Sequence, residues 1–198
     1  MEDTLLKELE KKEGIKNKFI EEVTLTNLNL YKKDIDNCKF VHVDILDSSL
    51  EKVYFKDITF NNCNFSNTTF ESCSFINCKF INCKMIGCNY IENTFISIQI
   101  QDSNLNYANF SNSSFNNFNI KNSTFVNSYL QESILKNTKF DKVDFSKAQI
   151  FKTSLKGVDL SKSIITGIST TLADIKGAII DEFQIMDLAY LLNIKIKE

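Results

Sequence analysis

The chain has 198 residues, 43% of them apolar, and a formal net charge of −2, which suits one domain with a buried core. All 23 basic residues are lysines, and the lack of arginine and of a positive excess argues against direct binding to DNA or RNA. No apolar stretch reaches about 18 residues, and the first residues are charged. We therefore expect no membrane span and no signal peptide, and a cytoplasmic location.

The first predicted element is a short helix over residues 3–13. Leu5, Leu6 and Leu9 form its apolar stripe, and Gly14 suits a C-terminal cap. We expect residues 1–22 to form an N-terminal helical cap, with residues 15–22 entering the following repeats irregularly.

A repeat of five residues dominates the rest of the chain. From Leu25 to Ile165 every fifth residue is apolar, at 29 positions without exception or insertion. The position two residues earlier is usually small or apolar, as at Cys73, Ala108 and Ser113, and the other three are mostly polar. Such a repeat indicates stacked units that bury a core only together.

A period of five fits neither a helix nor a simple strand, but it fits a chain that turns one corner every five residues. Four corners close a square coil of about 20 residues, and coils stack at about 4.8 Å, the usual distance between strands. The large residue and the small residue two before it point inward. We expect this solenoid to span residues 23–180, with Phe75, Phe95 and Phe115 in one vertical file.

The pattern resembles the pentapeptide-repeat family, whose consensus is a small residue, a polar residue, Leu or Phe, and two variable residues. Two segments that fit are Cys73-Ser74-Phe75-Ile76-Asn77 and Ala108-Asn109-Phe110-Ser111-Asn112. The resemblance implies an all-β solenoid, a right-handed quadrilateral parallel β-helix with short N-terminal and C-terminal capping helices. It says little about function, because one fold hosts many functions.

Cysteines and the single histidine are the candidates for chemistry. Four cysteines at intervals of five face a coil filled by aromatic residues, so we interpret them as small core residues and not as metal ligands: Cys73, Cys78, Cys83 and Cys88. Distance alone does not exclude a disulfide between Cys63 and Cys83, but reduced thiols are the default in the cytoplasm. His42 lies at an outward position without partners for a catalytic triad. We expect no enzyme activity, no metal and no cofactor.

We interpret the asparagines at the corners and at one inward position as structural residues. Asparagine recurs at one outward corner position, as at Asn77 and Asn117, where it supplies turn chemistry. Asn93 occupies an inward small position, and we expect it to bond to the backbone or to Ser113 one coil further on.

Two surface features are candidate partner surfaces. One wall carries Glu71, Glu92 and Glu132 in its middle coils. A protein that mimics DNA should be strongly negative, but residues 23–167 hold 15 lysines against 13 acids, so mimicry of DNA is poorly supported. Chance clustering explains the three glutamates equally well. An apolar belt rings one coil, either as a contact surface or as scattered β-forming residues: Ile76, Ile81, Ile86, Ile91 and Ile96.

The last segment, residues 181–198, is predicted to form a helix and a strand. Asp181 resembles an N-cap with Gln184 at the third helical position, and the helix would run to Leu192 with apolar residues nearly all round. We expect it to join two copies in a homodimer, with a plain end cap as the alternative. The expected interface residues are Phe183, Met186, Leu188, Leu191, Leu192, Ile194 and Ile196.

Residues 177–184, Gly-Ala-Ile-Ile-Asp-Glu-Phe-Gln, followed by Leu188, Leu192 and Ile194, look like the C-terminus of the Qnr and MfpA group. That resemblance implies binding to DNA gyrase and topoisomerase IV, protection from quinolones, a shape and charge somewhat like B-form DNA, and C-terminal dimers. The repeat has no insertion and so lacks the projecting loops of plasmid-borne Qnr proteins. We expect a non-catalytic binding protein for a type II topoisomerase, or alternatively a scaffold for an unrelated partner.

Overall fold

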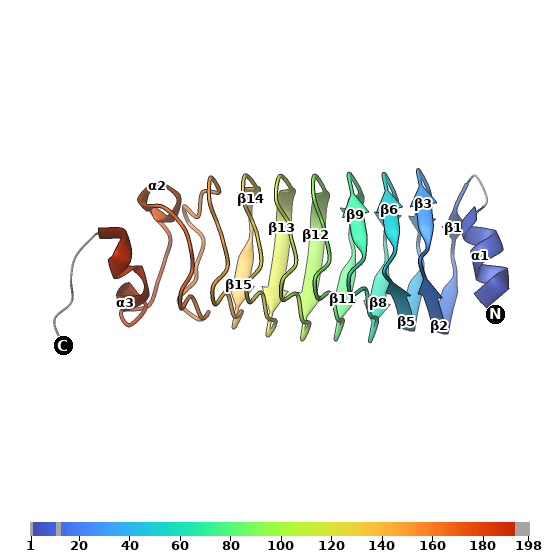
Figure 1. Cartoon of the computed structure of the whole chain (residues 1–198), viewed down its shortest axis with the longest axis horizontal. Helices are drawn as coiled ribbons and strands as arrows, with labels where there is room; N and C mark the ends of the chain where they lie inside the picture. The colour runs from blue at the N-terminus through green and yellow to red at the C-terminus, as the bar shows by residue number, and fades with distance from the viewer. Residues whose placement is uncertain (1, 11–12, 193–198) are drawn as a thin grey trace.

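The computed structural model describes residues 2–10 and 13–192. It is a rod of stacked square coils, with a helix at each end and strands running parallel from coil to coil (Figure 1). The fold is the expected right-handed, four-sided parallel β-solenoid. None of the helices in the described residues has the length and hydrophobicity needed to cross a lipid bilayer.

Parallel strands form the walls, and their register is 20 residues, so that Phe75 pairs with Phe55 on one side and Phe95 on the other. Sheet order runs β1-β4-β7-β10-β12-β11-β8-β5-β2, with β13, β14 and β15 attached through β12 and a separate sheet β3-β6-β9. The strands are β1 (Ile15–Lys16), β2 (Phe19–Thr26), β3 (Asn29–Tyr31), β4 (Asp34–Asp36), β5 (Lys39–Leu46), β6 (Ser49–Glu51), β7 (Tyr54–Lys56), β8 (Thr59–Asn61), β9 (Thr69–Glu71), β10 (Ser74–Ile76), β11 (Lys79–Ile81), β12 (Thr94–Gln101), β13 (Ser114–Lys121), β14 (Ile134–Lys136) and β15 (Lys139–Asp141).

The interior is a set of vertical files of large side chains, as the period of five predicts. The rings of Phe75, Phe95 and Phe115 stack with centroid distances of 5.1 and 5.0 Å, and all three side chains are buried. In the next file Tyr90 stacks between Phe70 and Phe110, at 4.8 Å from each. Each such pair adds about 0.5–1.5 kcal/mol beyond burial of apolar area, so the files stabilise the stack of coils.

The corners explain the recurring asparagines. Almost every residue at the second position after a large residue has positive φ, with Lys162 an exception. Twelve of the 27 non-glycine residues with positive φ are asparagine, which tolerates the left-handed region best after glycine. Their amides also bond along the rod: Asn37 Nδ2 donates to Asn17 Oδ1 at 2.7 Å, and Asn122 Nδ2 donates to Asp102 Oδ1 at 3.1 Å. The predicted turn role of asparagine is therefore confirmed.

The small side chain at the inward position also makes a hydrogen bond, because it donates to a backbone carbonyl of the preceding coil. Ser113 Oγ donates to Tyr90 O at 2.8 Å, and Cys88 Sγ donates to Phe65 O at 2.8 Å. Asn93 Nδ2 likewise donates to Phe70 O at 3.0 Å, while the Asn93 N–H donates to Ser113 Oγ at 3.0 Å. The expected bonding of Asn93 is confirmed, and cysteine serves here as a small donor as well as a small apolar residue.

At the N-terminal end α1 (Glu2–Glu10) covers the first coil, and its Leu5 and Leu9 are buried in the core. The regular ladder begins at Ile15, which pairs with Ile35, so the irregular entry expected for residues 15–22 is wrong. The reason is that Ile15 and the buried Ile20 already occupy the fifth-residue register. Gly14 has φ of +75°, and a Cβ there would lie 1.9 Å from Asp34 O, which explains the glycine.

The C-terminal end is more broken than predicted. An unpredicted helix, α2 (Leu172–Ile175), begins at the N-cap Thr171, and the expected helix from Asp181 to Leu192 is split into α3 (Ile185–Leu188) and the 3₁₀-helix η1 (Ala189–Leu192). The capping contact itself is present, since the Asp181 N–H donates to Gln184 Oε1 at 2.8 Å. Gln184 also anchors the end to the solenoid, because its Nε2 donates to Leu160 O at 2.9 Å and Ser163 O at 2.5 Å.

Candidate functional site

The inside of the solenoid leaves no room for a ligand. The interior space bounded by Leu9, Phe40 and Phe70 measures about 10 Å³, which is close to the minimum for a single water molecule. The outer walls and the ends of the rod are therefore the candidate surfaces for recognition.

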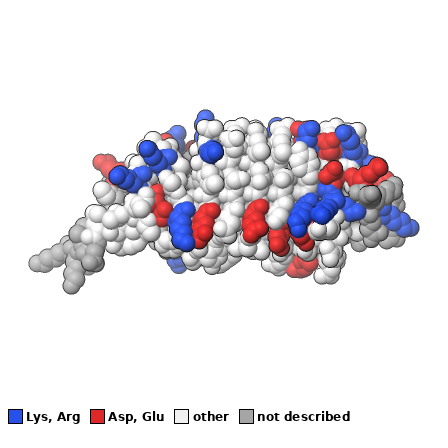
Figure 2. Space-filling view, turned by 90° about the horizontal axis from the view of Figure 1, so that it is seen from above, with Lys and Arg blue, Asp and Glu red and all other residues white. Residues whose placement is uncertain are grey.

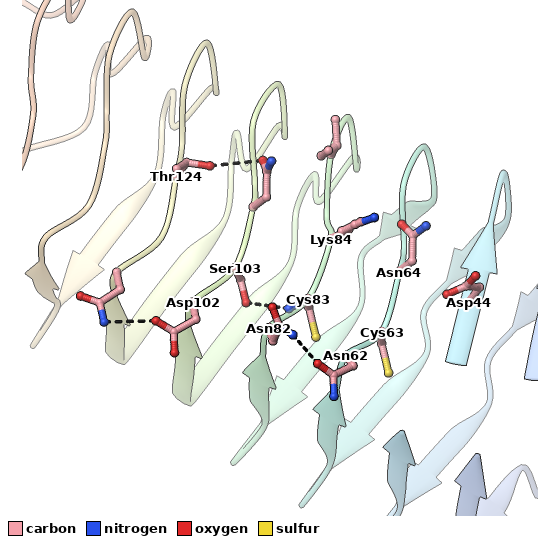
Figure 3. Close-up of a pocket in the computed structure, with 13 residues that line it drawn as sticks. Asp44, Asn62, Cys63, Asn64, Asn82, Cys83, Lys84, Asp102, Ser103 and Thr124 are labelled. Carbon is pink, nitrogen blue, oxygen red and sulfur yellow. Dashed lines mark hydrogen bonds between the residues drawn. The ribbon is translucent and has the colours of Figure 1, made fainter. Parts of the chain in front are cut away.

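A shallow groove of about 620 Å³ crosses several coils on one wall (Figure 3). Its lining is mostly amide and hydroxyl groups that bond to one another along the rod. Asn82 Nδ2 donates to Asn62 Oδ1, and Thr124 Oγ1 donates to Asn104 Oδ1 at 3.2 Å. The remaining lining residues are Asp44, Cys63, Asn64, Cys83, Lys84, Ile86, Asp102, Ser103 and Asn122.

The groove residues are arranged for structure and not for nucleophilic chemistry. Ser103 Oγ donates to Gln101 O at 2.8 Å and accepts from the Cys83 N–H at 3.0 Å, so its hydroxyl is fully engaged. The contact with the Cys63 thiol, together with burial, raises the pKa of the Cys83 thiol. The same contact lowers the pKa of the Cys63 thiol, but a reactive thiol also needs access to solvent, and both thiols are buried. In the described residues all six cysteines are free thiols and buried, and no group of acids, cysteines or histidine could hold a metal ion.

The three glutamates of the predicted acidic wall do face outward, but their charge is partly neutralised. Glu132 Oε1 lies 2.8 Å from Lys152 Nζ, one coil further on. Glu92 accepts a bond from Ser72 Oγ at 3.4 Å, and Glu71 is exposed nearby. The wall is therefore acidic only around Glu71 and Glu92. Figure 2 shows one face of the rod, with an uncharged area at its centre and charged side chains toward both ends and along one long edge.

The apolar belt lies where the repeat predicts it. Ile76 in β10, Ile81 in β11 and Ile96 in β12 are half-buried at outward positions, and Ile76 pairs directly with Ile96. Ile86 and Ile91, which complete the belt, are also half-buried. The coil of the belt itself holds the charged residues Lys79, Lys84 and Glu92, and a charge-poor stretch follows it, since residues 93–120 carry only Asp102 as a charged side chain. His42 is outward as expected, with its Nδ1 3.0 Å from Glu22 Oε1.

The C-terminal end carries most of the large exposed apolar side chains. Of the thirteen such residues in the described part of the chain, eight lie between residues 164 and 192. Phe183 is 78% exposed, Met186 59% and Leu192 56%. The others are Ile164, Leu172, Ile179, Ile185 and Tyr190. An apolar concentration of this kind at one end of a rod is typical of a contact site.

The residues predicted for the dimer interface divide into three groups. Phe183, Met186 and Leu192 are exposed, and Leu191 is half-buried, so they are available to a second copy. Leu188 is buried against the solenoid core and therefore acts in the end cap of its own chain, which corrects its assignment to the interface. Ile194 and Ile196 lie outside the described residues.

Sequence reasoning missed the anchoring role of Tyr190, which it counted only as an apolar residue. The Tyr190 hydroxyl donates to Ile168 O at 2.6 Å and accepts from the Thr170 N–H at 3.3 Å. The ring itself is 51% exposed, so the residue fixes the end cap while it presents an aromatic surface. An isolated tyrosine among leucines gives no signal of such a contact, because its partners lie about 20 residues earlier in sequence.

Two family descriptions match the chain: "Pentapeptide repeat region" over residues 33–110, and "Pentapeptide repeats (8 copies)" over residues 103–141 and 135–167. Together they cover more than half of the chain. No curated protein matches the sequence.

Similar solved structures include a trypsin-treated form of QnrB1, described as a plasmid-mediated fluoroquinolone resistance protein, with 18% identity over 93% of this chain and 98% of that chain and a TM-score of 0.47. HetL, from the cyanobacterium Nostoc sp. strain PCC 7120 and involved in regulation of heterocyst differentiation, has 17% identity over 86% and 88% and a TM-score of 0.39. Rfr23, from the cyanobacterium Cyanothece 51142, has 15% identity over 90% and 99% and a TM-score of 0.29. Likeness at this level identifies no partner.

Proposed function

Because this chain belongs to the pentapeptide-repeat family, we propose that it is a non-catalytic binding protein that presents its outer surface to a macromolecular partner. The packed interior supports this proposal, since it leaves no space for a substrate. The groove supports it as well, because its hydroxyl and amide groups bond to one another and its thiols are buried. Rigid repeats with a regular outer face are suited to recognition over an extended area.

The proposed partner is a type II topoisomerase, DNA gyrase or topoisomerase IV, whose quinolone poisoning the protein would relieve in the cytoplasm. Support comes from residues 177–184, which resemble the tail of the Qnr and MfpA group and here make the capping contact between Asp181 and Gln184. We place the contact on the isoleucine belt and on the charge-poor coil that follows it. The acidic wall is the weaker choice, because Lys152 neutralises Glu132.

The observation that carries the proposal furthest is the exposed apolar surface at the C-terminal end. We propose that it joins two copies into a homodimer, which is how the Qnr and MfpA group is expected to assemble. The variant Phe183→Glu with Met186→Glu should give monomers in light scattering, because both side chains are exposed and neither supports the core. Ile134→Glu, at a residue 57% exposed but away from this end, is the matched control and should leave the dimer intact. A wild-type monomer at micromolar concentration would exclude the interface.

The test of the proposed partner is a supercoiling reaction with purified DNA gyrase, with and without the protein and with ciprofloxacin as the second variable. We expect the protein either to restore supercoiling in the presence of the drug or to change supercoiling in its absence. Unchanged supercoiling in both conditions would remove the topoisomerase from the proposal and leave only the binding protein.

A scaffold for an unrelated partner is the second candidate. The observation in its favour is the charge of the repeat region, where residues 23–167 hold 15 lysines and 13 acids, whereas a mimic of DNA needs a strong negative excess. Absence of binding to purified DNA gyrase would favour this scaffold over the topoisomerase binder.

A further inference from the structure

The ladder of hydrogen bonds between coils opens on two adjacent walls near the C-terminal third of the rod. The Glu132 N–H donates to Phe151 O at 2.9 Å on one side of the opening, and the Ile164 N–H donates to Val143 O at 2.9 Å on the other. Between these points, all within the described residues, no strand pairing or backbone-to-backbone hydrogen bond joins residues 133–142 to residues 152–163. A single side-chain bond, from the Ser133 N–H to Thr153 Oγ1 at 2.9 Å, remains at the rim. We call this opening the split.

The next coil bonds toward the C-terminal end instead. The Leu155 N–H donates to Asp174 O and the Leu160 N–H to Ile179 O, each at 2.8 Å. Its corners also differ, because the Val158 N–H closes a turn onto Leu155 O at 2.9 Å, whereas the preceding coil has extended strands β14 and β15 at the same places. Strands β14 and β15 therefore pair only with β13, and each keeps one free edge inside the rod.

The split exposes groups that are covered elsewhere. Leu135 and Thr138 are half-buried, while Phe115 and Phe118, at the same positions one coil earlier, are each 1% exposed. A groove of about 460 Å³ follows the split. Its lining residues are Asn137, Thr138, Lys139, Phe140, Asp141, Gly157, Asp159 and Lys162.

Backbone groups at the corner between β14 and β15 lie beside this groove without a backbone partner. In the intact part of the same wall the Asn77 N–H donates to Ile96 O at 2.8 Å, and Cys78 O accepts from the Gln99 N–H at 3.0 Å. By the 20-residue register, the equivalent groups at the split are the N–H of Asn137 and the C=O of Thr138. A free strand edge of this kind is a template for pairing with another extended chain.

We propose that the split is a docking site for an extended acidic segment of a partner protein, which adds a strand to β14 and β15. Such strand addition obtains affinity from backbone bonds and specificity from the side chains beside the edge. Charge favours an acidic occupant, because residues 133–142 and 152–163 hold six lysines and two aspartates, of which two lysines and both aspartates line the groove itself. Lys152 pairs with Glu132, and Asp141 lies 3.9 Å from Lys121. The C-terminal tail of a second copy fits less well, since it carries Lys195 and Lys197.

The test uses the full chain and a fluorescent peptide of about nine residues in which Glu alternates with Val or Thr, the length and pattern of a single strand. Hydrogen exchange of the free protein should be fast at Leu135, Asn137 and Phe140 and slow at Phe115, Asn117 and Ile120 one coil earlier. The acidic peptide should slow exchange at the first three amides about ten-fold or more. A peptide with Lys in place of Glu, and an acidic peptide interrupted by proline, should both fail to bind.

Charge reversal supplies the matched pair of variants. Lys139→Glu with Lys162→Glu should weaken binding of the acidic peptide about ten-fold or more, because both lysines line the groove. Lys79→Glu, in the same file on the intact wall, should leave it unchanged. The proposal is overturned by absence of binding, by binding that leaves exchange at β14 and β15 unaltered, or by protection that rises with protein concentration alone, which would identify a second copy as the occupant. Hydrogen exchange of the wild-type protein with and without the acidic peptide tests the proposal even if a variant fails to fold.

Discussion

Replacing Asn93 with alanine should destabilise the middle of the rod, because this buried amide bridges neighbouring coils. Asn93 Oδ1 accepts from the Cys73 N–H at 2.6 Å, and Asn93 Nδ2 donates to Phe70 O at 3.0 Å. Alanine leaves one donor and one acceptor unpaired in the interior, at about 1–3 kcal/mol each, so the expected loss is about 2–6 kcal/mol. Serine can make both bonds, as Ser113 does toward Tyr90 O and from the Asn93 N–H. We expect Asn93→Ser to lie within about 1 kcal/mol of the wild type.

The assay is urea unfolding followed by far-ultraviolet circular dichroism, since the chain has no tryptophan to report by fluorescence. The change in midpoint at constant slope gives the change in the free energy of unfolding. Equal losses for the alanine and serine variants would refute the reasoning, because they would show that size and not hydrogen bonding governs the inward small position.

Three further predictions follow from the same geometry. Tyr90→Phe should raise the free energy of unfolding by about 1 kcal/mol in the same assay, because among the described residues the buried Tyr90 hydroxyl meets only the weakly bonding Cys88 thiol. A loss of stability would show that this contact stabilises the core. Burial raises the pKa of the Cys78 thiol to about 12 from its ordinary 9.0, so this group favours folding below about pH 9 and its contribution is lost as pH rises toward 12. Cys78→Ser should therefore flatten the alkaline loss of stability, and an unchanged pH profile would contradict this assignment. Ile81→Lys with Ile91→Lys should abolish binding of the partner while circular dichroism stays unchanged; binding that persists would make the belt purely structural.

Much of the architecture could be predicted because one rule governs most of the chain. The five-residue period places Phe75, Phe95 and Phe115 in one file, and corner asparagines follow from the left-handed backbone that each corner needs. The outward location of the belt and of the three glutamates follows from the same register. These features are local and repeat at fixed intervals, so sequence spacing is sufficient to place them.

The remainder depends on contacts that the period does not encode. The split at β14 and β15 is invisible in the sequence, because Leu135, Phe140, Leu155 and Leu160 keep the period without interruption. The two coils separate because one forms the extended strands β14 and β15, whereas the next forms a hydrogen-bonded turn between Leu155 and Val158. The spacing of apolar residues does not record this difference in backbone conformation. Burial of Leu188 depends in the same way on how Gln184 docks onto the last coil, so an apolar pattern alone could not distinguish a cap residue from an interface residue.

Direct binding between the purified protein and purified DNA gyrase, followed by sedimentation velocity, tests the central claim that the outer surface serves to bind a type II topoisomerase. The account predicts a complex at micromolar concentrations that the paired lysine substitutions at Ile81 and Ile91 abolish. Absence of a complex at up to about 100 µM of each protein, which corresponds to a binding free energy weaker than about −5.5 kcal/mol, would contradict it.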